Sequence, residues 1–436
     1  MKRNLFFMAL SAMALVTSCS NDEVTEISDS NAIKFDVTAG NVTRAIDVFC
    51  NNKKPSSFKV WADIASDASS YFAGDDVSKN GTTWESSTKR YWPSDNLFFY
   101  ASNVSLTKDN NDYKVNDFTV NSNVNSQVDL LYAVNKGTKV DNAYPGVSKS
   151  TTPVSLNFRH ALSQIVFKAK NVNEHLYVKV DGVALYNVET KATYTLPTDN
   201  TFDNIDDHLN TTTTDPASTT RGTWTYPTTP VWGGYQITNL TAVELNGSLS
   251  ASSGNQYKIN DVANLTDLTD NNNTVTNDNN VLLLLPQQTK TEDGKTVAQK
   301  DKLVLNSSKT KPAGYTKSTT EGEQGTFAAN SNDGSYFLVK CAIANIAGST
   351  FDSTTDKYLW GSASATKWVI IPASFPWEQG KKYIYTFVFG NGNGGYNPDP
   401  EDPDPDPVLV PITYTVSVDD FIKGEFNDVK VDTDGK

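Results

Sequence analysis

The apolar segments of this chain are short, and their length most constrains the fold. Nearly every one spans four to eight residues, is rich in β-branched or aromatic residues, and is bounded by Asn, Asp, Gly, Pro or Ser. Such segments are typical of strands separated by turns, and their spacing favours antiparallel β-sandwiches. The sequence therefore predicts an all-β fold. Examples are FKVWADI (58–64), LFFYA (97–101), VDLLYA (128–133), QIVFKA (164–169) and YIYTFVF (383–389); YFLVKCAIANI (336–346) is a longer segment of the same kind.

The first alternating segment lies in NAIKFDVTAG, at residues 31–40. Ile33, Phe35 and Val37 alternate with polar residues, which predicts a strand with one buried face. A few residues later comes Arg44, followed by Ala45, in a TRA sequence that no strand pattern requires. Since packing does not account for an isolated arginine just after a core strand, we look for a functional role for Arg44.

The last alternating segment follows a spacer rich in Gly, Pro and Asp. The spacer GNGNGGYNPDPEDPDPDP begins at residue 390 and predicts a flexible joint followed by a stiff, extended stretch. Its carboxylates lack the spacing of an EF-hand calcium loop. Beyond it, ITYTVSV places Ile412, Tyr414, Val416 and Val418 on one face of a strand. A strand carried on such a spacer need not fold back into its own domain.

The N-terminal segment has the features of an export signal. Lys2 and Arg3 precede the apolar run NLFFMALSAMALV, which is too short to span a bilayer stably. The run ends in VTSC, and a small-small-Cys ending resembles a bacterial lipobox. This resemblance implies cleavage before Cys19, lipidation of the Cys19 thiol and export; the alternative is an ordinary secretory signal. The acidic SNDE that follows resembles a surface-export signal of lipoproteins in some Gram-negative anaerobes.

Charge and cysteine content disfavour three classes of protein: nucleic-acid binders, proteins with a polybasic membrane-binding surface, and disulfide-stabilised scaffolds. The net charge of −13 disfavours nucleic acid and a polybasic membrane surface, so we expect membrane contact only through the lipid anchor. Cys50 and Cys341 are too few and too far apart in sequence for a disulfide framework. We interpret both as small buried hydrophobic residues, with a bridge between them as the alternative.

No catalytic, metal-binding or cofactor-binding motif is apparent. The histidines lack metal-ligand spacing, and the sequence has no GxSxG, P-loop or GxGxxG motif in a suitable context. Acidic pairs could form a glycosidase dyad, although carboxylates in polar turns are usually solvated. We therefore predict that the chain is not an enzyme. The residues considered are His160, His175, His208, Asp75, Asp76, Asp206 and Asp207.

A group of aromatic residues flanked by Gly, Pro and Thr supports a different hypothesis. Exposed aromatic rings on loops stack on sugars, so the chain could be a monomeric surface lipoprotein that binds glycans. The competing interpretation is that these rings belong to the core of a sandwich. The residues are Trp224, Trp232, Tyr235 and Trp360.

Several segments in this order, behind a lipobox and a TRA sequence, resemble the fimbrillin-like family. This family comprises the type V pilins and related Mfa-like surface lipoproteins of oral and gut anaerobes. The matching segments cover most of the chain. They are KRYWPSDNLFFYAS (89–102), VDLLYA (128–133), VSLNFRHALSQIVFKAK (154–170), LLLLPQQT (282–289), WEQGKKYIYTFVFGNG (377–392) and ITYTVSVDDF (412–421).

The resemblance implies two tandem transthyretin-like antiparallel β-sandwich domains with a C-terminal donor strand. The length of 436 residues agrees with two domains. We place the seam near Thr151, just before VSLNFRHALSQIVF. The expected segments are a signal peptide (1–18), an anchor and leading-strand propeptide (19–44), an N-terminal domain (45–150), a C-terminal domain (151–390), a linker (391–408) and a C-terminal strand segment (409–436).

The resemblance also implies a route of assembly. A trypsin-like, arginine-specific surface protease would cut between Arg44 and Ala45 and release the leading strand. The C-terminal strand of another subunit would then fill the vacated groove. The implied partners are other fimbrial subunits, the protease, and a host protein or glycan at the receptor end. The implied locations are the outer membrane for the lipid-anchored precursor and the fimbrium for the processed subunit.

The residue patterns support this route independently. The leading strand and the C-terminal strand are alternating segments of similar length and apolarity, and removal of one would leave unpaired backbone groups that the other could bind. Burial of three or four such side chains contributes roughly 1.5 to 3 kcal/mol each before ordering costs. The contact is head-to-tail, so its repetition gives a filament. A tip or anchor subunit is the alternative, as is a chain never cut at Arg44 that stays anchored through Cys19.

Overall fold

The structure is a computed structural model, and it describes the parts of the chain that carry the strands. Arg44, Ala45, Cys19 and Cys50 lie outside the described residues. The described residues are 31–39, 54–138, 140–141, 143–173, 175–197, 221–237, 243–246, 266–267, 282–287, 312–320, 323–348, 351–352, 354–373, 376–390, 395, 397–398 and 412–420.

Within these residues the secondary structure is almost entirely β, which confirms the predicted class. The one helical element among the named elements is a 3-10 helix of three residues, Val124–Ser126. Two short strands, β18 (Tyr315–Thr316) and β19 (Thr326–Phe327), form a small separate hairpin.

Seven strands of the N-terminal part close into a barrel. Their order is β1-β4-β3-β2-β5-β8-β9. Every pairing is antiparallel except that of β1 with β9, which is parallel. Parallel neighbours need a long connection, and the chain supplies it because the other barrel strands lie between them in sequence. The strands are β1 (Lys34–Ala39), β2 (Ser57–Ile64), β3 (Ser70–Asn80), β4 (Thr83–Ser86), β5 (Leu97–Ser102), β8 (Leu131–Asn135) and β9 (Val154–His160).

Two sheets of the C-terminal part pack face to face. One has the order β16-β10-β23-β24, with β17 also paired to β10, and the other has the order β14-β11-β20-β21, with β15 and β22 on its flanks. Phe337 of β20 contacts the rings of Phe167 and Tyr385 in the facing sheet, as expected in a sandwich. The strands are β10 (Ser163–Asn171), β11 (Leu176–Glu189), β14 (Trp232–Ile237), β15 (Val243–Asn246), β16 (Thr266–Asp267), β17 (Leu282–Leu284), β20 (Tyr336–Asn345), β21 (Lys357–Trp360), β22 (Lys367–Pro372), β23 (Lys381–Phe389) and β24 (Ile412–Asp420).

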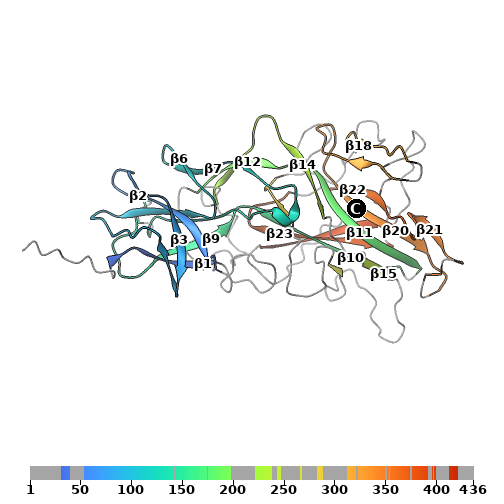
Figure 1. Ribbon diagram of the computed structural model, residues 1–436, viewed down its shortest axis with the longest axis horizontal. Coiled ribbons are helices and arrows are strands. Elements are labelled where there is room, and N and C mark those ends of the chain that lie inside the picture. Colours follow the sequence, from blue (N-terminus) through green and yellow to red (C-terminus); the bar gives the residue numbers. More distant parts are fainter. Residues whose placement is uncertain are drawn as a thin grey trace, which may run out of the picture.

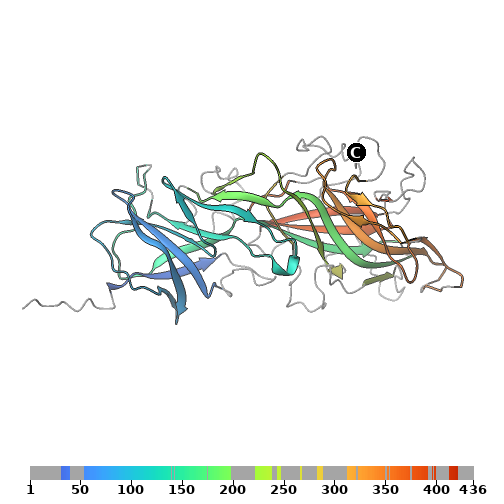
Figure 2. The same ribbon diagram turned by 45° about the horizontal axis from the view of Figure 1, so that its top comes forward.

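The molecule is elongated, with the barrel strands β1, β2 and β3 at one end and β20, β21 and β22 at the other (Figure 1). The turned view shows the same separation (Figure 2). A sheet of order β13-β12-β7-β6 connects the two parts, because it pairs β7, which lies between barrel strands in sequence, with β12, which follows the sandwich strands β10 and β11. Its strands are β6 (Thr107–Asp109), β7 (Asp112–Thr119), β12 (Lys191–Thr195) and β13 (Thr223–Thr225).

The chain passes from the barrel to the sandwich later than the predicted seam at Thr151. Strand β9 pairs with β1 and β8, so it is a barrel strand, and β10 opens the next sheet. The crossing therefore falls at Ala161 and Leu162. The physical reason is that the alternate side chains of β9 are buried in the barrel core, in the cluster that also contains Phe35.

Cys341 lies within β20 and is a free, fully buried thiol. Burial raises the pKa of this thiol, which disfavours the reactive thiolate. Cys341 thus behaves as the small buried residue that its sequence context predicts.

A polar network stabilises the junction between the two parts. The side-chain amide of Gln379, just before β23, lies 3.1 Å from the hydroxyl of Tyr132, 2.9 Å from that of Tyr194 and 2.7 Å from the carbonyl of Arg221. Tyr132 belongs to the barrel and Tyr194 to β12, and both hydroxyls also donate to the Arg221 carbonyl. One amide therefore connects three segments that are distant in sequence.

Replacement of this amide is expected to loosen the junction. Gln379→Ala leaves buried hydroxyl and carbonyl groups with fewer partners, which should lower the free energy of unfolding by about 1 to 3 kcal/mol. Gln236→Ala, at an exposed position of β14, is the matched control and should change it by less than about 0.5 kcal/mol. Urea unfolding of both variants measures the difference, and equal effects would contradict a bracing role.

Candidate functional site: the slot of β1 and the C-terminal strand

Strand β1 occupies a position between β4 and β9, which we call the β1 slot. Phe35 lies opposite Trp84 of β4 on one side and opposite Val154 of β9 on the other. Just before the strand, the Ile33 amide donates to the Arg90 carbonyl at 2.8 Å. The barrel is closed only because β1 fills this slot.

The inward face of β1 is held by apolar burial. Phe35 and Val37 are fully buried and Ile33 is 3 % exposed. The ring of Phe35 is surrounded by those of Phe58, Phe72 and Phe99, with edge-on geometry and centroid distances of 6.2, 6.1 and 5.8 Å. Such edge-to-face contacts add to the burial energy. The three predicted leading-strand residues are therefore together in the barrel core.

The outward face of β1 is charged and contributes little. Lys34 pairs with Glu85 at 2.8 Å, and Asp36 pairs with Lys54 at 3.7 Å. The hydrogen bond from Lys34 lowers the pKa of Glu85, so this small stabilisation is present at neutral pH and is lost as the pH falls through that lowered pKa. Partly exposed pairs of this kind contribute at most about 1 kcal/mol.

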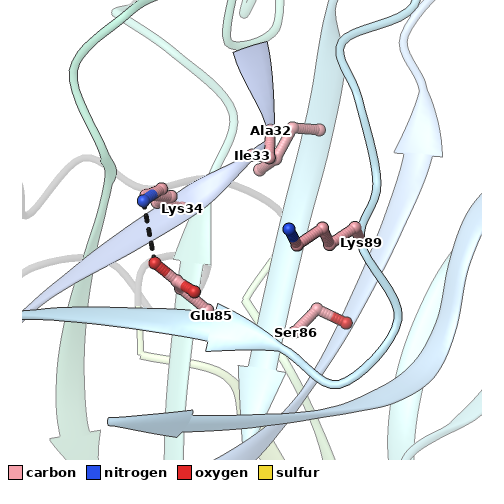
Figure 3. Close-up of a pocket in the computed structure, with 6 residues that line it drawn as sticks. All are labelled: Ala32, Ile33, Lys34, Glu85, Ser86 and Lys89. Carbon is pink, nitrogen blue, oxygen red and sulfur yellow. Dashed lines mark ion pairs between the residues drawn. The ribbon is translucent and has the colours of Figure 1, made fainter. Parts of the chain in front are cut away.

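A small pocket lies beside this ion pair. Figure 3 shows Lys34 and Glu85 at its rim, with Ser86 and Lys89 on the other side. Its volume of about 50 Å³ is far below that of a small-molecule site, which is typically ~300 Å³ or more. This pocket cannot hold a sugar ring.

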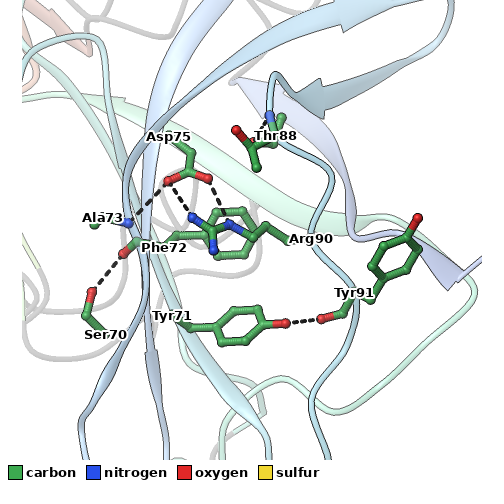
Figure 4. A network of polar contacts seen from close by, with 9 residues as sticks. Ser70, Tyr71, Phe72, Ala73, Asp75, Thr88, Arg90 and Tyr91 are labelled. Carbon is green, nitrogen blue, oxygen red and sulfur yellow. Dashed lines mark hydrogen bonds and ion pairs between the residues drawn. The ribbon is translucent and has the colours of Figure 1, made fainter.

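A second polar network fixes the segment against which β1 begins. The Arg90 guanidinium donates to Asp75 at 3.0 and 3.4 Å and lies over the Phe72 ring, while the Tyr71 hydroxyl donates to the carbonyl of Tyr91 (Figure 4). Tyr91 in turn forms a β-bridge with Ala32. These side-chain contacts hold the segment beside the start of β1, in addition to its backbone contacts with Ala32 and Ile33.

In this structure the C-terminal strand folds onto its own domain. Strand β24 pairs antiparallel with β23 from Phe389–Ile412 to Lys381–Asp420, at the end of the strand order. Ile412, Tyr414 and Val416 are buried, and the ring of Tyr414 contacts those of Phe337 and Tyr385 at 5.6 and 5.7 Å. The backbone of Val418 lies opposite Tyr383. The four predicted donor residues thus belong to one edge strand.

The candidate catalytic groups are engaged in structural contacts. Asp75 binds Arg90, and Asp76 forms an ion pair with Lys59. His160 is buried against the carboxylate of Asp129. No group of three or more His, Cys, Asp or Glu residues suited to a metal is found among the described residues. His208, Asp206 and Asp207 lie outside them, and His175 is exposed.

The aromatic residues considered for glycan binding lie on three strands, β13, β14 and β21. The indole N–H groups of Trp224 and Trp360 donate to backbone carbonyls of Ala161 and Lys367 at 2.8 and 3.1 Å. Tyr235 is buried, and Trp232 is half-buried in β14. These positions favour packing over a shared sugar platform.

The part of the chain that the structure describes contains no helix with the length and hydrophobicity needed to cross a membrane.

Comparison with known proteins identifies the class. A family model described as fimbrillin-like matches residues 41–401. The chain belongs to the fimbrillin-like family. The match begins after β1 and ends before β24. Comparison with curated proteins finds no match.

Two of the solved structures that match the chain come from Bacteroides species. A fimbrial protein from Bacteroides vulgatus is 12 % identical, with a TM-score of 0.46, and the alignment covers 89 % of this chain and 99 % of that one. A protein described as a "putative cell adhesion protein" from Bacteroides uniformis is also 12 % identical, with a TM-score of 0.36 and coverage of 90 % and 99 %.

Family membership indicates a fimbrial protein of the cell surface. The residues that build the walls of the β1 slot were not predicted. The alternation of Val154, Leu156 and Phe158 was visible in the sequence, but nothing local indicated that β9 would pair with β1.

Loss of the Phe35 ring is expected to weaken the barrel selectively. Phe35→Ala should cost about 3 to 5 kcal/mol, because it leaves a cavity among three phenyl rings. Hydrogen exchange should then increase at the amides of β4 and β9, with β20 and β23 unchanged. Lys34→Gln removes only the outward ion pair and is the control, with an expected loss below about 1 kcal/mol. A uniform increase across both parts would contradict a local role for β1.

Proposed function

We propose that this chain is the precursor of a polymerising fimbrial subunit. It is exported as a lipoprotein attached to the outer membrane through Cys19, cut between Arg44 and Ala45, and joined to other subunits by strand exchange. The observation that carries the proposal is the β1 slot: a strand whose apolar face is buried closes a barrel and is followed within a few residues by an arginine. A single cut there leaves β1 held by noncovalent contacts alone.

The other arginines of the mature chain are poor protease sites, which supports Arg44 as the cleavage point. The carbonyl of Arg90 accepts the Ile33 amide, and its side chain is bound to Asp75. Arg159 lies inside β9, opposite Tyr132. The carbonyl of Arg221 accepts hydrogen bonds from two tyrosine hydroxyls and the Gln379 amide. A protease must bind its target in an extended, accessible form, and these three segments are held in other contacts.

Strand β24 suits the role of a donor because of its place in the sheet. It has one paired neighbour among the described strands, β23, so it can leave without breaking the interior of the sheet. The preceding spacer of alternating Asp and Pro favours an extended conformation that carries the strand outward. An edge strand on a stiff tether is a natural element for addition to another sheet.

The energetics permit exchange only after cleavage. An empty slot exposes backbone groups of β4 and β9 together with the apolar site of Ile33, Phe35 and Val37. Insertion of a strand with three comparable side chains would stabilise the barrel by roughly 5 to 9 kcal/mol through apolar burial, before the cost of ordering the strand. Departure of β24 from its own sheet costs a comparable burial of Ile412, Tyr414 and Val416, so exchange into an empty slot is close to balanced. Exchange into an occupied slot also requires β1 to leave and is therefore unfavourable. The subunit that donates β24 still has its own slot, which can accept the β24 of another subunit. Repetition of this head-to-tail contact gives a filament.

Limited proteolysis tests the proposal. A low dose of an arginine-specific endoprotease should yield a stable product that starts at Ala45 and forms multimers. Arg44→Gln should stay monomeric under the same treatment, and Arg221→Gln, the matched control, should behave as the parent chain. N-terminal sequencing and size-exclusion chromatography with light scattering provide the readouts.

An excess of a synthetic peptide covering Ile412–Asp420 should trap the cleaved chain as a monomer with bound peptide. A product that starts at Ala45 and stays monomeric without the peptide would refute assembly by strand exchange. The chain would then fit the alternative of a basal or non-polymerising surface subunit.

A further inference from the structure

The leading strand and the C-terminal strand match position by position in the same direction. Residues 33–37 read Ile-Lys-Phe-Asp-Val, and residues 412–416 read Ile-Thr-Tyr-Thr-Val. The inward positions are thus Ile, aromatic, Val in both strands. In their own sheets these positions are also the buried ones.

The β1 slot selects for residue size. Phe35 is fully buried among Phe58, Phe72 and Phe99, so its site fits one ring closely. Tyr414 is the one aromatic residue among the alternate positions 412, 414, 416 and 418. A shift of two residues would place this ring in the site of Ile33 or Val37 and leave an aliphatic side chain in the site of Phe35. Both errors are unfavourable, one through overpacking and the other through a cavity.

Two directions of entry keep Tyr414 in the site of Phe35, and side-chain volume distinguishes them. Entry in the direction of β1 places Ile412 in the site of Ile33 and Val416 in that of Val37. The reverse direction exchanges them, so an extra methylene group must enter the fully buried site of Val37 while the site of Ile33 is underfilled.

Pro411 also favours the direction of β1. In that direction it takes the place of Ala32, before the ladder begins. The hydrogen bond at this bridge is donated by the next residue, Ile33, to Arg90, and the Ile412 amide can replace it. In the reverse direction Pro411 would take the place of Thr38, within the ladder with β9. Proline is confined to the edges and first residues of strands.

We infer that β24 of a second copy of this chain enters the β1 slot in the same direction as β1, parallel to β9 and antiparallel to β4, with Tyr414 in the place of Phe35. This inference rests on the strand exchange proposed above. Thr413 and Thr415 then take the outward places of Lys34 and Asp36, so the joint lacks both ion pairs of the precursor.

Disulfide trapping tests the direction and the register together. Asp36 lies opposite Ser155, an exposed residue of β9, so Thr415 should lie opposite Ser155 in the joint. In the reverse direction Thr413 would lie there instead. Directly opposed strand residues are close enough for a disulfide. The experiment mixes full chains with Ser155→Cys and with either Thr415→Cys or Thr413→Cys, in a background of Cys19→Ser and Cys50→Ser. The mixtures are cleaved with the arginine-specific protease, oxidised and separated without reductant.

The expected result is an intermolecular cross-link with Thr415→Cys in about tenfold excess over Thr413→Cys. Dominance of the Thr413→Cys cross-link would overturn the direction. Multimers without either cross-link would overturn the register while leaving strand exchange intact. Absence of multimers would refute the proposed function and this inference with it. Tyr414→Phe should cross-link as well as the parent residue, because Phe35 fills the same site without a hydroxyl.

Discussion

The ring of Phe35 in its cage of Phe58, Phe72 and Phe99 is the contact on which the barrel depends. It secures a strand that only noncovalent contacts would retain if the chain behind it were cut. The outward ion pairs of the same strand are weak and partly exposed. Retention of β1 is therefore a matter of shape and apolar burial, which a different strand of equal shape can reproduce.

Further contacts hold the segment beside the slot. Arg90, Asp75 and Tyr71 hold the segment beside the start of β1 through bonds that do not involve β1 side chains. The alternate residues of β9 continue the same core from the other side. The proposed replacement of β1 requires that these contacts keep the slot in shape while it is empty.

The all-β class and the two buried strand faces could be predicted because alternation is a local signal. The alternation of apolar and polar residues predicts that Ile33, Phe35 and Val37 are buried on one face of their strand, and it predicts the same for Ile412, Tyr414 and Val416. All six are buried in the structure. The point where the chain leaves the barrel is not a local signal, because the alternation of β9 reveals a buried face without revealing its partner. Its pairing with β1 joins residues more than a hundred positions apart. The ion pair of Asp75 with Arg90 also depends on the tertiary structure. The adjacent acidic residues Asp75 and Asp76 in a polar stretch do not indicate in sequence which basic residue they will contact.

The short connection between β9 and β10 has a mechanical consequence. Strand β9 borders the slot, and after Ala161 and Leu162 the same chain becomes β10, which pairs in parallel with β23. Strand β23 leads directly into the spacer that precedes β24. In a filament joined through the slot, a pulling force would pass from the joint into β9, across to β10 and β23, and out through the next tether. The load would act along strand axes and shear many hydrogen bonds at once, and the Gln379 network would brace the point where the force changes sheets.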